Sequence, residues 1–143
     1  MSVDTVLERL ASNDKAAVGR MIDWLRIPSI STDPKYRDDT RRAAEWLAAQ
    51  LRELGLSVQI KETGDIGPDG KGKGHPIVLA ESAAKPGYSG PRVLFYGHYD
   101  VQPVDPVNLW DSPPFEPVVK PAVPGGPGER VVARGAVDDK GQV

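Results

Sequence analysis

The sequence contains no cysteine among its 143 residues. A disulfide framework and a thiolate metal site are therefore both excluded, and any bound metal must take its ligands from histidine, aspartate and glutamate. The apolar runs are too short to span a bilayer, and the N-terminal segment lacks the basic-then-apolar order of a secretory signal. We therefore expect a cytoplasmic protein that does not associate with a membrane.

An excess of charge of one sign is also missing. Lysine and arginine number 18 against 20 aspartates and glutamates, which gives a net charge of −2. Because neither a basic stripe nor a lysine- and arginine-rich tract occurs, nucleic acid is not an expected partner. The 39% of hydrophobic residues in a chain of this length can supply the core of one domain.

Two helices are predicted in the first third of the chain. Apolar residues that recur on one face predict the first helix from Asn13 or Asp14 to Arg26. Pro28 ends it, because the residue before a proline is disfavoured in the helical conformation. The second helix is predicted from Asp38 or the next residue to Leu54, and a glycine follows it. Its predicted buried stripe consists of four apolar residues: Ala44, Leu47, Leu51 and Leu54.

After the second helix the hydrophobic period changes to alternation, which predicts strands. Residues 56–60 and 75–82 are expected to pair across a glycine-rich hairpin loop at residues 64–74. The apolar run 93–96 is expected to form an interior strand that is buried on both faces. Helices that precede and cover such a sheet predict the α/β fold class.

The last third of the chain is rich in proline. Residues 103–127 contain eight prolines, which excludes a long helix and favours an extended loop with short edge pieces. A strand is expected to resume at residues 130–133, and a turn follows at residues 134–141. Because the sequence stops where another helix is expected to begin, we expect a mixed sheet that is truncated before it is complete.

A histidine and an acid follow the predicted interior strand, in the order Gly97-His98-Tyr99-Asp100. Residues two apart in a strand point to the same side, so His98 and Asp100 should face one site. A carboxylate beside an imidazole fixes its tautomer and makes the free nitrogen a better metal ligand. Ligand sites in open α/β sheets lie beyond the carboxyl ends of strands, where this pair is placed. A purely structural hydrogen bond between the two residues is the alternative.

A second acidic group follows the next predicted strand. Asp138 and Asp139 are adjacent carboxylates that repel each other, and near a buried edge they would be costly without a cation. The alternative is a solvated turn in which an aspartate caps the following helix. The residues alone leave both interpretations open.

Three segments together resemble the M20 metallopeptidase family: GHYDVQP at 97–103, WDSPPF at 110–115 and RGAVDDKGQV at 134–143. They occur in the order and spacing of that family and are most similar to its dipeptidase and carnosinase-like branch. The two leading helices and Ile27-Pro28-Ser29 fit as well. The resemblance therefore implies that residues 1–143 are the N-terminal part of a zinc-peptidase-like catalytic domain.

This resemblance implies roles for individual residues. His98 is similar to a ligand of one metal, Asp138 to the carboxylate that bridges two metals, and Asp100 to the acid that orients the histidine and tunes the catalytic base. Asp139 lies where the family has a cis peptide after the bridging acid. Imidazole and carboxylate ligands suit zinc, two ions per complete site, with cobalt or manganese as substitutes.

The reaction that the resemblance implies is hydrolysis of an amide bond in dipeptides or related small peptides, by a water activated between two divalent metals. An N-acyl-amino-acid deacylase of the same family is one alternative, and a truncated non-catalytic product is another. The general-base glutamate, further ligands and a lid domain that mediates dimerisation would lie beyond residue 143. We therefore expect the chain alone to be inactive and its parent to be a homodimer that acts on a small peptide substrate.

Several other residues are not expected to serve this site. His75 precedes a proline and is expected to face solvent, and Arg134 is assigned no catalytic role. Trp24 and Trp46 are expected to pack in the core. Asp105 and Asp111 are expected to serve turns.

Overall fold

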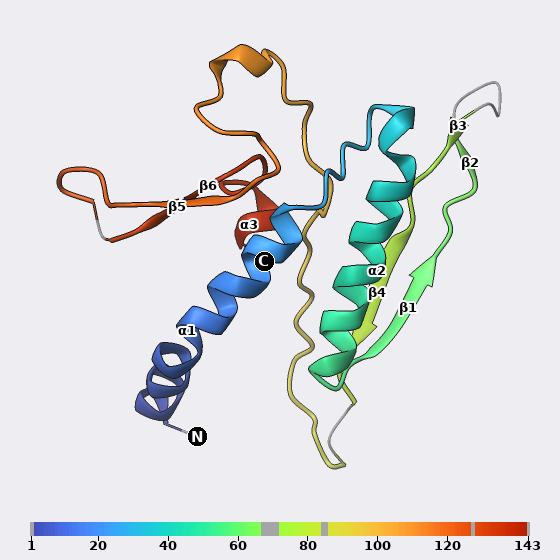
Figure 1. Ribbon diagram of the computed structural model, residues 1–143. Coiled ribbons are helices and arrows are strands. Elements are labelled where there is room, and N and C mark those ends of the chain that lie inside the picture. Colours follow the sequence, from blue (N-terminus) through green and yellow to red (C-terminus); the bar gives the residue numbers. More distant parts are fainter. Residues whose placement is uncertain (1, 67–71, 84–85, 127, 143) are drawn as a thin grey trace.

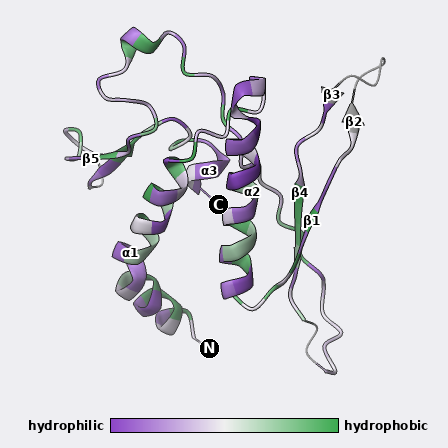
Figure 2. Cartoon of the chain, turned by 45° about the vertical axis from the view of Figure 1, so that its right-hand side comes forward, coloured by the Kyte–Doolittle hydropathy of each residue, from purple (hydrophilic) through white to green (hydrophobic). Residues whose placement is uncertain are grey.

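The computed structural model describes residues 2–66, 72–83, 86–126 and 128–142 (Figure 1). Two long helices and three short antiparallel ribbons make up most of the described part. Figure 2 shows hydrophilic and hydrophobic residues side by side along both long helices, as expected where only one face of a helix is buried. Among the described residues, no helix is both long enough and apolar enough to cross a membrane.

Helix α1 spans Val3–Leu25, so its start was predicted too late and its end correctly. The side-chain oxygen of Ser2 accepts a hydrogen bond from the backbone N–H of Thr5 at 3.2 Å and caps the helix. Only Trp24 and Leu25 of α1 are buried. Apolar side chains at helical spacing do occur between residues 3 and 10, although they are exposed, and the predicted start overlooked this pattern.

Helix α2 spans Arg37–Glu53, close to the predicted limits, and a short 3-10 helix, η1 (Pro34–Tyr36), leads into it. It packs against a ribbon of two strands, β1 (Ser57–Lys61) and β4 (Ile77–Glu81) (Figure 1). Gly55 follows the end of α2 with a φ of +82°, the left-handed conformation that was predicted to stop the helix.

The predicted buried stripe of α2 is only partly confirmed, because Ala44 is buried but the three leucines are not fully buried. Leu54 is 76% exposed, and Leu47 and Leu51 are only partly buried. Small side chains make up the fully buried face of the helix. The buried residues of α2 are Thr40, Ala43, Ala44 and Ala48.

The main hydrophobic cluster joins the end of α1 to α2. Trp24 and Trp46 stack with their ring centroids 5.1 Å apart and an angle of 16° between the ring planes. This contact confirms that both tryptophans pack in the core. The cluster consists of Trp24, Ile27 and Ala43, with Trp46, Leu47 and Tyr99 packed against them.

The predicted hairpin after α2 is confirmed. Strands β1 and β4 pair antiparallel, with Ser57 opposite Glu81, and alternate residues of β1 are partly buried as predicted. A second short ribbon, β2 (Asp65–Ile66) with β3 (Gly72–Lys73), lies nearer the tip of the hairpin. The tip itself, in the predicted loop 64–74, lies partly outside the described residues.

The prediction of a buried interior strand at residues 93–96 is wrong. These residues belong to no strand, and their exposed fractions range from 74% to 92%. An interior strand needs a paired neighbour on each edge and a covering layer on each face. In the described part of the chain this segment first pairs at its far end, where Val101 forms a parallel bridge with Ile30.

The remaining elements surround the C-terminal turn (Figure 1). The proline-rich segment contains the 3-10 helix η2 (Val107–Leu109) and the strand β5 (Val118–Lys120), which pairs antiparallel with β6 (Arg130–Val132). The short helix α3 (Asp139–Gln142) contacts α1. The structure thus confirms an α/β fold, in which helices lie against small antiparallel sheets.

Candidate metal centre

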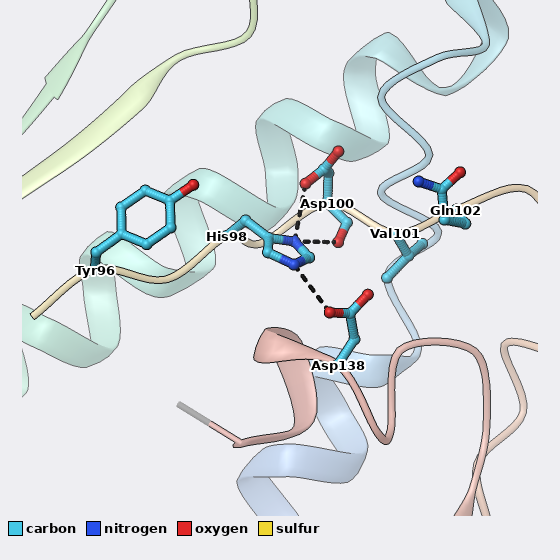
Figure 3. Close-up of a pocket in the computed structure, with 6 residues that line it drawn as sticks. All are labelled: Tyr96, His98, Asp100, Val101, Gln102 and Asp138. Atoms are coloured by element: carbon cyan, nitrogen blue, oxygen red, sulfur yellow. Dashed lines mark hydrogen bonds and ion pairs between the residues drawn. The ribbon is translucent and has the colours of Figure 1, made fainter.

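The three residues selected from the sequence lie together at one open pocket (Figure 3). The pocket has a volume of about 300 Å³ and forms where the extended segment that ends at Val101 meets the turn before α3. His98 and Asp100 come from the extended segment and Asp138 from the turn. The lining residues are Tyr96, His98, Asp100, Val101, Gln102 and Asp138.

Backbone contacts bring the two halves of the site together. The N–H of Val101 donates to the carbonyl of Ser29 at 2.9 Å, which fixes the end of the extended segment. Gly135 has a φ of +87°, and a Cβ added there would lie 2.8 Å from the Cγ1 of Val101. Only glycine suits both the positive φ and this close approach, so the turn that carries Asp138 can lie against Val101.

The imidazole of His98 lies between two carboxylates (Figure 3). Its Nδ1 is 3.1 Å from both the carbonyl oxygen and the Oδ1 of Asp100, and its Nε2 is 2.9 Å from the Oδ1 of Asp138. One ring nitrogen is therefore engaged by Asp100 of the same extended segment, and the other is directed at the turn. This is the arrangement expected of an oriented metal ligand.

Asp139 joins the same group, although it was not predicted as a ligand. Its Oδ2 accepts a hydrogen bond from the backbone N–H of His98 at 2.9 Å and lies 3.8 Å from the Nε2 of that residue. The possible ligand atoms of His98, Asp138 and Asp139 all lie within 4.8 Å of one another. The adjacent pair of aspartates was the only sequence signal for this third donor.

One expectation for Asp139 is not met. The cis peptide that the family resemblance implied at this residue is absent, because the bond between Asp138 and Asp139 is trans. Among the described residues, the only cis peptide bond joins Asp105 to Pro106. In the trans form the N–H of Asp139 donates to the Oδ1 of Asp138 at 3.0 Å, which partly satisfies the carboxylate that faces His98.

The charges around His98 change its protonation. Partial burial lowers the pKa of the imidazole, but the hydrogen bond to the Asp100 carbonyl and the charges of Asp138, Asp139 and Asp100 outweigh it. The net effect is a pKa raised above the ordinary value of 6.5. The three carboxylates thus favour a positive charge at this place, and a divalent cation would answer the same demand once His98 is neutral. The donor set therefore fits a metal ion.

Lys140 is one of the most deeply buried residues of the described part of the chain. Its Nζ donates to the carbonyl of Ile27 at 2.5 Å and to the Oγ of Ser29 at 2.9 Å, and the residue is 1% exposed. Burial lowers its pKa to about 7. No sequence pattern indicated this contact, because its partners lie more than a hundred positions away.

The residues set aside in the sequence lie outside the donor group. His75 does not face solvent as predicted: it is partly buried, and its Nε2 lies 2.8 Å from the carbonyl oxygen of Ser31. Asp111 forms an ion pair with Lys120 at 3.3 Å. The guanidinium of Arg134 lies 4.9 Å from the centre of the Trp110 ring, a cation–π contact that supports no catalytic role.

Comparisons of sequence identify relatives with a known activity. Residues 94–143 match the model of peptidase family M20/M25/M40. The Cys-Gly metallodipeptidase dug1 of Schizosaccharomyces pombe is 31% identical over 142 residues, which cover 99% of this chain and 28% of the relative. The Beta-Ala-His dipeptidase of Rattus norvegicus is 35% identical over 125 residues, which cover 85% of this chain and 24% of that relative. The chain thus spans about a quarter of the length of these relatives.

Comparisons of structure agree. The dipeptidase Dug1p from Saccharomyces cerevisiae superposes with a TM-score of 0.82 at 26% identity, over 99% of this chain and 29% of that one. Human carnosine dipeptidase 1 gives a TM-score of 0.81 at 28% identity, over 96% of this chain and 28% of that one.

Proposed function

The chain is a relative of the M20 metallopeptidases, and from this premise we propose that it forms the N-terminal part of the catalytic domain of a metal-dependent dipeptidase. The named relatives are a Cys-Gly metallodipeptidase and a Beta-Ala-His dipeptidase, which favours dipeptides over N-acyl amino acids. The observation that carries the proposal is the convergence of His98, Asp138 and Asp139 within 4.8 Å. Because the chain spans 28% of a relative's length, hydrolysis is proposed for a longer protein that contains it.

Zinc is the proposed metal, with two ions in a complete site and cobalt or manganese as substitutes. Imidazole nitrogen and carboxylate oxygen are suitable donors for these ions. His98 would hold one ion, Asp138 would bridge both, and Asp139 is a further donor of the same group. A divalent ion supplies Lewis-acid chemistry, which polarises a peptide carbonyl and makes water a stronger nucleophile.

The protein residues prepare this chemistry by orientation. Asp100 engages the Nδ1 of His98 at 3.1 Å, which leaves the Nε2 facing Asp138. A proton kept on Nδ1 would leave Nε2 with a free lone pair for the metal. The catalytic role expected for Asp100 is therefore proposed to act through His98, by fixing the tautomer and the direction of the ring.

The chain by itself is proposed to be inactive. Two zinc ions with tetrahedral coordination need more donors than one imidazole and two carboxylates supply. The pocket of about 300 Å³ is consistent with a small peptide substrate. Dimerisation through a lid domain and a cytoplasmic location stay predictions from the sequence.

The proposal can be tested on the complete protein that contains this segment. The protein would be stripped of metal with a chelator and reloaded with zinc, cobalt or manganese, and hydrolysis of Cys-Gly and of β-Ala-His would be measured. We expect activity to return with metal. Parallel assay of an N-acyl amino acid tests the deacylase alternative. A protein that hydrolyses neither dipeptide with any of the three metals would refute the proposal.

A further inference from the structure

Asp100 is bound through both of its carboxylate oxygens. Its Oδ1 faces the Nδ1 of His98 at 3.1 Å, and its Oδ2 accepts a hydrogen bond from the hydroxyl of Ser31, which lies in the turn between α1 and η1. We propose that Ser31 is a positioning residue of the metal centre, which fixes the Asp100 carboxylate and through it the His98 ring. This inference rests on the proposed metal-binding function of His98.

The loop before Ser31 is attached firmly to the site. The backbone of Ser29 accepts from the N–H of Val101 at 2.9 Å, and its hydroxyl donates to the carbonyl of Tyr99 at 2.7 Å. The buried Nζ of Lys140 adds hydrogen bonds to Ile27 and Ser29. The loop is therefore bound both to the segment that carries His98 and to the helix that follows Asp138.

Ser31 is also held from the opposite side. The Nε2 of His75 lies 2.8 Å from the carbonyl oxygen of Ser31, so the segment before β4 contacts the serine backbone. The phenol of Tyr99 donates to the carbonyl of Pro76 at 2.5 Å, which ties the same segment to the residue between His98 and Asp100. With its backbone held in this way, Ser31 can present its hydroxyl to Asp100 in one direction.

A carboxylate that is held at only one oxygen can turn about its terminal torsion, which has a broad energy profile. The Ser31 hydroxyl stops this rotation, and a hydrogen bond to an ionised acceptor is stronger than one between neutral groups. Without it, the contact between Asp100 and the Nδ1 of His98 would loosen, and the ring would lose its fixed direction. Residues that orient metal ligands in this way typically change metal affinity about 10- to 100-fold when they are replaced.

The first experiment measures zinc affinity of the full chain by competition with a chromophoric chelator. We expect Ser31→Ala to bind zinc about 10- to 100-fold more weakly than the wild type, and Ser31→Thr, which keeps the hydroxyl, to recover most of the loss. Ser12→Ala is the matched control, because Ser12 is exposed and its hydroxyl bonds only within α1. Equal zinc affinity in Ser31→Ala and wild type would overturn the proposal.

The second experiment uses the metal-free chain and separates this proposal from the metal-binding function itself. An NMR spectrum that correlates the ring nitrogens of His98 with their protons should change in Ser31→Ala and stay unchanged in Ser31→Thr and Ser12→Ala. If the chain alone does not bind zinc, the spectrum still decides the role of Ser31, while the function proposed for the longer protein is tested separately by its own hydrolysis assay. If Ser31→Ala does not fold, the near-isosteric pair Ser31→Val and Ser31→Thr replaces it. Identical His98 signals in that pair would then overturn the proposal.

Discussion

The Nε2 atom of His98 lies 2.9 Å from the Oδ1 atom of Asp138, although 40 positions separate the two residues in the sequence. This contact joins the extended segment to the turn before α3 and creates the donor group with Asp139.

Zinc should bind the chain weakly and through His98. So few protein ligands rarely hold zinc tightly, and an imidazole is the only nitrogen donor of the group. Calorimetric titration of the chain should therefore show weak binding that is lost in His98→Ala. Asp111→Ala removes a carboxylate outside the site and should leave the affinity unchanged. Tight binding that survives His98→Ala would show that the site is assigned wrongly.

Replacement of Asp138 should abolish activity of the complete protein. An alanine at this position removes the carboxylate proposed to bridge two ions and leaves the Nε2 of His98 without its 2.9 Å partner. We expect hydrolysis of Cys-Gly by Asp138→Ala to fall to the background rate, while circular dichroism shows an unchanged fold. The bridging role would be excluded by turnover equal to that of the wild type.

The elements that the sequence predicted well are those with a local pattern. The end of α1 before Pro28, the helix α2 and the hairpin of β1 and β4 all follow from periodicity, a proline or a glycine. The beginning of α1 also carries apolar residues at helical spacing, between residues 3 and 10, but they are exposed and the prediction overlooked them. The run 93–96 does have the composition of a buried strand, but composition states only what could be buried and not which neighbours are there to cover it.

The candidate site shows the same division. His98, Asp100 and Asp138 were found because two of them share a short motif and the third belongs to a motif of the same family. Their mutual contact agrees with that prediction, whereas their chemical roles stay predictions. Ser31 and Lys140 carried no local signal, because their contacts depend on how distant segments pack. Side chains that support a site from another part of the chain become visible only in three dimensions.

Leu25 should contribute strongly to stability because it is fully buried at the end of α1. Leu25→Ala should lower the free energy of unfolding by about 2–5 kcal/mol, the usual cost of a cavity at a buried leucine. Leu10→Ala is the matched control in the same helix, where the side chain is 63% exposed, and it should change stability by no more than about 0.5 kcal/mol. Denaturant unfolding of both variants measures the difference, and equal losses would mean that Leu25 is not packed as described.

Gly135 should be more sensitive to alanine than Gly55, although both glycines have positive φ angles, +87° and +82°. At Gly55 a Cβ meets nothing within 4 Å, so the cost of Gly55→Ala is only that of the left-handed backbone, about 1–2 kcal/mol. At Gly135 the Cβ would lie 2.8 Å from the Cγ1 of Val101. Overpacking adds to the backbone cost, and Gly135→Ala should lose about 2–4 kcal/mol.

The same pair of variants links the fold to the metal centre. Relief of the clash at residue 135 has to move either Val101, which follows Asp100, or the turn that carries Asp138. Either movement changes the distance between His98 and Asp138, so Gly135→Ala should weaken zinc binding while Gly55→Ala leaves it unchanged. Zinc titration under conditions where both variants are folded measures this effect. If the two variants bound zinc equally well, the close contact between Gly135 and Val101 would not be what sets the geometry of the site.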